Sequence, residues 1–108
     1  MSHYDFLFTY SVSPYSDEDR KVKLADKVRR NIAEIEMDSW QKLDDVETTF
    51  TGTVNLQSST MSGKRDEAEK IVRDALREVI DEHGAYSDTW VNVALMVSGL
   101  GECITIRI

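Results

Sequence analysis

The residues best suited to binding chemistry are four cations that recur at helical spacing in the first third of the chain. They follow one another at intervals of three, four and three positions, and they are Arg20, Lys23, Lys27 and Arg30. Residues at such intervals lie on one side of a helix. A line of cations suits contacts with phosphate groups or with an acidic partner. It is also typical of a solvated helix face, on which Asp19 would pair with Lys23 and Asp26 with Arg30.

Patterns that specify catalysis or metal binding are absent from the sequence. It contains no phosphate-binding glycine loop, dinucleotide fingerprint, zinc spacing or nucleophile elbow. His3 and His83 are the only histidines, and the single cysteine, Cys103, excludes an internal disulfide. We therefore predict no catalytic residue, no metal and no cofactor, and we expect Cys103 to be a packed, unreactive thiol in a terminal strand.

The charge balance restricts the classes of partner. The 108 residues include 13 basic and 20 acidic side chains, for a net charge of −7. This sign argues against a protein whose whole surface binds phosphates. The acidity either serves solubility or forms a surface directed at a basic partner. The length predicts one domain, residues 1–108, and the lack of an apolar run of about 20 residues predicts a soluble, cytoplasmic protein.

The element that must position these residues is the segment 4–12, which we predict to be the first and central strand of a sheet. Its alternation places five large side chains on one face, namely Tyr4, Phe6, Phe8, Tyr10 and Val12. Such a row is typical of a buried core face. The alternative is a stacking platform for nucleic-acid bases, which requires that the rings face solvent.

Two helices and the remaining strands follow in an order that defines the fold class. Apolar residues at three- and four-residue spacing predict helices over about 17–35, with Ser16 as the cap, and about 64–83, ended by Gly84. Period-two patterns predict hairpins over 37–56 and 89–108, and Gly52 within the first hairpin indicates a bulge or a close backbone approach. The fold class is α+β: a ferredoxin-like βαββαβ sandwich with an extra C-terminal strand, and two helices on one face of an antiparallel sheet.

The strand over residues 89–98 is apolar on both faces. Its second face carries Trp90, Ala94 and Met96. A strand that is apolar on both sides is normally covered on both sides. In a domain of this size we expect the second cover to be another subunit, so these three residues are the predicted homodimer interface.

One family resemblance follows from the order of elements. The segment YDFLFTYSV, its Tyr/Ser turn and helix, and the later WQKLDDVETTFTGTV resemble the small ferredoxin-like CRISPR-associated nuclease subunits of spacer acquisition. They are also similar to GhoS-type antitoxin endoribonucleases. The CRISPR-associated family places a metal-binding acidic residue at the end of its first strand, where this chain has Ser11. Asp5 lies near the other end of the strand, so the resemblance does not imply a metal-dependent nuclease here.

These observations predict a small, dimeric, non-catalytic binding module. It would contact nucleic acid, preferably RNA, or an acidic partner through the cations at positions 20, 23, 27 and 30, in a toxin–antitoxin or defence setting. One alternative is an acidic inhibitor or decoy of the phage anti-defence type, which binds a basic nucleic-acid-binding protein. A second is an endoribonuclease of the GhoS type.

Overall fold

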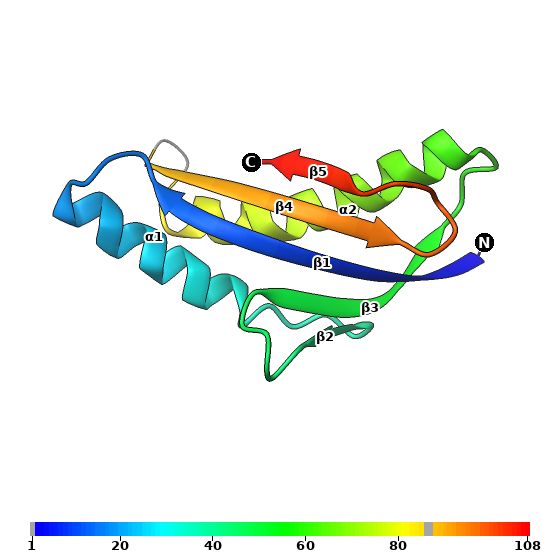
Figure 1. The fold of residues 1–108 in the computed structure, drawn as a ribbon, viewed down its shortest axis with the longest axis horizontal. Helices are drawn as coiled ribbons and strands as arrows, with labels where there is room; N and C mark the ends of the chain where they lie inside the picture. The colour runs from blue at the N-terminus through cyan, green and yellow to red at the C-terminus, as the bar shows by residue number, and fades with distance from the viewer. Residues whose placement is uncertain (1, 86–87) are drawn as a thin grey trace.

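The computed structural model describes residues 2–85 and 88–108 of the chain. Within these residues a five-stranded antiparallel sheet packs against two helices (Figure 1). The elements, in chain order, are β1 (Ser2–Pro14), α1 (Asp19–Ile32), β2 (Trp40–Lys42), β3 (Thr49–Leu56), α2 (Met61–Glu82), β4 (Thr89–Val97) and β5 (Ile104–Arg107). The predicted α+β class with an antiparallel sheet is confirmed, and the arrangement is compatible with a ferredoxin-like fold.

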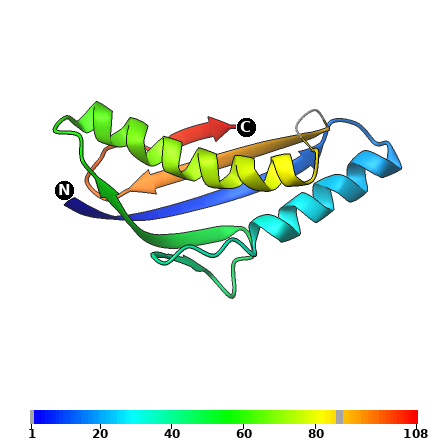
Figure 2. The ribbon, with the colours of Figure 1, turned by 180° about the vertical axis from the view of Figure 1, so that it is seen from behind.

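The sheet is built around β1, as predicted. The strand order is β2-β3-β1-β4-β5, so β1 pairs with β3 on one side and with β4 on the other. Both helices lie over the same face of the sheet (Figure 2). The opposite face faces the viewer in Figure 1, and neither helix lies over it. We call this surface the open sheet face.

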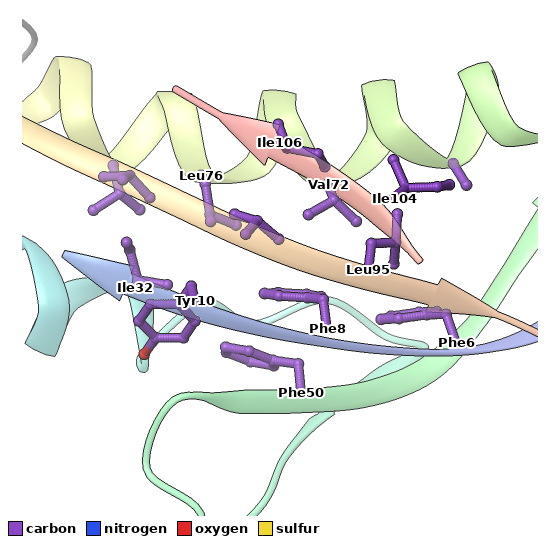
Figure 3. Packing of buried hydrophobic residues seen from close by; sticks show 14 of the residues in the cluster. Phe6, Phe8, Tyr10, Ile32, Phe50, Val72, Leu76, Leu95, Ile104 and Ile106 are labelled. Carbon is purple, nitrogen blue, oxygen red and sulfur yellow. The ribbon is translucent and has the colours of Figure 1, made fainter. Parts of the chain in front are cut away.

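The hydrophobic core lies between the sheet and the helices. The aromatic row of β1 points into it, and Phe8 stacks on Phe50 of β3 with ring centroids 5.1 Å apart (Figure 3). Helix side chains such as Ile32 and Leu76 complete the core, and all four of these residues are fully buried. The core interpretation is confirmed for Phe6, Phe8, Tyr10 and Val12, which are buried, while Tyr4 at the start of the row is partly buried against the core.

Gly52 marks the close backbone approach that its position within a strand indicated. It pairs with Trp40 of β2 and with Phe6 of β1. A Cβ at this position would lie 2.1 Å from the carbonyl oxygen of Ser39. That oxygen also accepts a hydrogen bond from the backbone N–H of Thr53 at 3.0 Å. The missing side chain therefore lets the segment before β2 pack directly against β3.

Both helices begin at other residues than predicted. Helix α1 begins at Asp19, and its N-cap is Glu18, so the expectation of a Ser16 cap was wrong. The reason is that β1 continues to Pro14, which leaves residues 15–18 to turn the chain. Helix α2 begins earlier than expected, at Met61, because the hydroxyl oxygen of Thr60 accepts a hydrogen bond from the Gly63 N–H at 3.0 Å.

A carboxylate from α2 holds the loop that precedes this helix. Glu67 accepts hydrogen bonds from the backbone N–H groups of Gln57, at 3.0 Å, and Ser58, at 2.6 Å. These two bonds stabilise the ionised carboxylate, so they lower the pKa of Glu67 below its ordinary value. The end of β3 is thereby tied to the first turns of α2.

Candidate binding surfaces

The four predicted cations lie along one side of α1, and all four are exposed. We call them the basic stripe. Arg20, at the start of the helix, donates two hydrogen bonds of 3.2 Å to the carboxylate of Asp88, just before β4. These bonds lower the pKa of Asp88. The first cation of the stripe thus joins α1 to the sheet.

The other stripe residues differ in their partners. Lys23 pairs with Asp19 at 3.8 Å, as predicted. The predicted pair of Asp26 with Arg30 was wrong: the Asp26 carboxylate pairs with Arg29, and Arg30 donates to the Asp26 backbone oxygen, at 3.4 Å. Lys27 forms no ion pair within residues 2–85 and 88–108. The stripe is therefore aligned as the spacing required, but carboxylates offset part of its charge.

Arg29, which sequence reasoning did not single out, joins α1 to β1. Its guanidinium donates to the backbone oxygen of Val12 at 2.8 Å. The hydroxyl of Tyr10 donates to the Arg29 backbone oxygen at 3.4 Å. Burial raises the pKa of Tyr10 to about 12, although the positive charge of Arg29 acts in the opposite direction. This contact has a structural role.

The open sheet face carries the residues predicted for the homodimer interface. The strand register aligns Leu7 with Met96, and Thr9 with Ala94, in neighbouring rows of β1 and β4. Leu7 and Met96 are 41% and 44% exposed. Small side chains follow along the two strands, and a hollow of about 370 Å³ lies over them. The centre of this face is thus uncharged and partly apolar.

Trp90 lies at the far end of the open sheet face and is 38% exposed. Its ring contacts Tyr15, with centroids 4.6 Å apart, and the guanidinium of Arg107 lies 4.4 Å from its ring centre. Arg107 also donates to the side-chain oxygen of Asn92 at 3.1 Å. The structure therefore places Trp90, Ala94 and Met96 on one surface. Their role as an interface stays a prediction.

A third surface, which the sequence did not reveal, is a groove of about 330 Å³ between the C-terminal end of α1 and the second half of α2. We call it the helical groove; Figure 2 shows the face on which the two helices lie. Its apolar floor consists of Ile35, Met37, Ala75 and Val79. Its rim carries four carboxylates, from Glu34, Glu36, Glu78 and Glu82, together with Asn31. All four glutamates are exposed, and none is in an ion pair within the described residues.

The remaining chemically capable residues are not brought together. Asp5 and Ser11 lie exposed on the open sheet face, and His3 lies exposed near the start of β1. No group of three His, Cys, Asp or Glu side chains that could hold a metal ion occurs in the described part of the chain. Cys103 is exposed, so the expectation of a packed thiol was wrong. It precedes β5, whose inward residues begin at Ile104.

Comparisons with known proteins do not assign this chain to a family. No family model matches it, and no curated protein or solved structure matches it either. Neither α1 nor α2 is long and apolar enough to cross a membrane. The functional argument therefore depends on the three surfaces of the molecule itself.

Proposed function

We propose that this chain is a small, non-catalytic binding module whose partner is a basic protein rather than a nucleic acid. One observation carries the proposal: four unpaired carboxylates gather on the rim of one groove in the helical layer. None of these glutamates is in an ion pair within the described residues. Two of the four stripe cations, Arg20 and Lys23, are matched by carboxylates, which leaves only Lys27 and Arg30 without a carboxylate partner among those residues. Together with the net charge of −7, this distribution attracts cations and repels phosphates.

This proposal favours the inhibitor or decoy alternative over recognition of nucleic acid through the basic stripe. An acidic module of this kind can occupy the nucleic-acid-binding surface of a basic protein, as a phage anti-defence protein or an antitoxin would. The proposed fold is the ferredoxin-like βαββαβ plan, with β5 as the additional terminal strand. The proposed location is the cytoplasm, where an exposed thiol such as that of Cys103 stays reduced.

The test compares fluorescence anisotropy of labelled poly-L-lysine and of labelled single-stranded RNA, titrated with the protein over a salt series. We expect binding of poly-L-lysine that weakens as salt is raised, and no binding of RNA at low salt. The outcome that contradicts the proposal is RNA binding with a log–log salt slope of about three to four ions. Loss of that binding in Lys23→Glu/Lys27→Glu would then establish the basic stripe as the site.

We further propose that two copies associate through the open sheet face. The molecule measures 46 by 26 Å along its two longest axes, and the open sheet face lies in the plane of these axes (Figure 1). A standard interface takes roughly 800 Å² from each partner. Leu7, Met96 and Trp90 supply exposed apolar area without a central charge.

Sedimentation velocity tests this association. Met96→Asp should convert the dimer to a monomer, because it introduces an unpaired charge where two faces meet. Met61→Asp is the matched control, since Met61 is also an exposed methionine but lies at the start of α2. A wild-type protein that sediments as a monomer at high concentration would contradict the proposed dimer and leave the basic-partner proposal intact.

A further inference from the structure

The helical groove combines an apolar floor with an acidic rim. Its floor is apolar, and Met37 within it is 40% exposed. Its rim holds glutamates on two separate segments: Glu34 and Glu36 follow α1, and Glu78 and Glu82 lie one turn apart on α2. The exposed apolar floor favours contact with an apolar side chain of a partner. The acidic rim favours a partner that carries positive charges beside that side chain.

We propose that the helical groove binds one amphipathic helical segment of the basic partner, with a large apolar side chain on the floor and lysine or arginine side chains on both rims. This inference rests on the proposed function and names the surface through which it operates. A helix with an apolar stripe flanked by cations presents this arrangement of side chains.

The volume of the groove is suited to a few side chains of a partner. At about 330 Å³ the groove is at the low end of the range of roughly 300–1,000 Å³ that proteins use for small ligands. Its residues come from two helices and the segment after α1, so it offers no strand edge. An extended peptide could not add to this site as a further strand of the sheet, which favours a helical segment as the occupant.

The arrangement of the glutamates excludes a simpler explanation of the rim. A single divalent cation needs several oxygen ligands within about 2.5 Å of one point. No such group of three acidic side chains occurs in the described part of the chain. The carboxylates instead come from separate positions along the groove. This arrangement suits a partner whose positive charges are also spread along its length. A phosphate backbone would be repelled by the same rim.

The experiment uses two synthetic peptides of about 15 residues, long enough for about four helical turns. Both contain only leucine and lysine in the same amounts; one has leucines at helical spacing and the other is scrambled. Isothermal titration calorimetry measures the affinity of the full chain for each peptide. Methyl NMR shifts of Ile35, Met37 and Val79 show whether the peptide lies on the groove floor.

Two charge-reversal variants separate the groove from the general acidity of the protein. Glu78→Lys/Glu82→Lys changes the rim, and Asp17→Lys/Asp66→Lys makes the same change in net charge at exposed positions outside the groove. We expect the helical peptide to bind at least about tenfold more tightly than the scrambled one. The rim variant should lose about tenfold or more of that affinity, and the control variant less than about threefold.

The failures of the two proposals are distinguishable. If both peptides bind equally and both variants weaken them equally, the groove inference is overturned, while recognition of a basic partner stands. If neither peptide binds at low salt, both proposals are overturned. Floor methyl shifts that stay unchanged while the helical peptide binds would move the site away from the groove and also refute the inference.

Discussion

Replacing Gly52 with alanine should destabilise the protein, because the sheet leaves no room for the added methyl group. The new Cβ would lie 2.1 Å from the Ser39 carbonyl oxygen and 3.0 Å from the Trp40 Cα. Both atoms belong to the backbone, so no side-chain rotation relieves the overlap. The segment before β2 must move away from β3, and the hydrogen bond from Thr53 to Ser39 is lost.

The expected magnitude follows from what that movement disrupts. Overpacking of this kind costs about 1–3 kcal/mol. Trp40 also makes edge contacts with Phe6, Phe8 and Phe50, with centroids 5.4, 5.3 and 5.8 Å apart, and such pairs contribute about 0.5–1.5 kcal/mol each. Replacing a glycine within a strand by alanine also stabilises the protein by about 0.5–1 kcal/mol, because the unfolded chain loses conformational entropy. Because some ring contacts will survive, we expect Gly52→Ala to lower the free energy of unfolding by about 2–4 kcal/mol.

Urea denaturation followed by circular dichroism and by tryptophan fluorescence measures this change. Thr51→Ala is the matched control, because Thr51 is the adjacent residue of β3 and already carries a Cβ; it should cost no more than about 1 kcal/mol. A Gly52→Ala protein whose free energy of unfolding lies within about 0.5 kcal/mol of wild type would refute the argument from close approach.

Two further predictions concern pH. The pKa of Glu67 is lowered in the folded state, so its carboxylate stabilises the protein above the ordinary pKa of 4.5, and this stabilisation is lost as the pH falls through the folded pKa. The difference in free energy of unfolding between wild type and Glu67→Gln, measured by urea titration at a series of pH values, should therefore vanish in strong acid. A difference that does not change with pH would contradict this prediction. The pKa of Tyr10 is raised from 10.0 to about 12, so stability should fall as the pH rises from about 10 to about 12, and this fall should be smaller in Tyr10→Phe. Tyrosinate absorbance of the folded protein checks the assignment, and full titration of all four tyrosines near pH 10 would contradict it.

The parts of the fold that depend on local periodicity were predictable from the sequence. The alternation over residues 4–12 predicted which side of β1 is buried, and the apolar spacing around Leu76 predicted α2 and its buried face. The starts of the helices were less predictable. Ser16 and Thr60 each stand before a helix and are both acceptable caps, but only Thr60 is used, because β1 continues to Pro14 and α1 begins only at Asp19. The exposure of Cys103 follows from the alternation that buries Ile104, once β5 is known to begin there.

The binding surfaces differ in how much of them the sequence contains. The basic stripe is encoded within one helix, so spacing alone located it. The partner of Arg20, however, is Asp88, which lies far away in the chain and becomes a neighbour only after folding. The helical groove was missed for the same reason, because Glu34 and Glu78 meet only through the packing of two helices. The local signal was the pair Glu78 and Glu82, one turn apart beside Val79.

The central position of β1 has a consequence for the synthesis of the protein. Phe6 pairs with Val97, and Pro14 pairs with Thr89, so the middle of the sheet closes only after β4 has left the ribosome. Until then one edge of β1 and part of its aromatic row have no cover. Contacts this distant in sequence form slowly, because the chain must first lose the entropy of a long loop. The nascent chain should therefore expose an unpaired strand with apolar side chains during most of its translation. Chaperones would bind the chain in this interval.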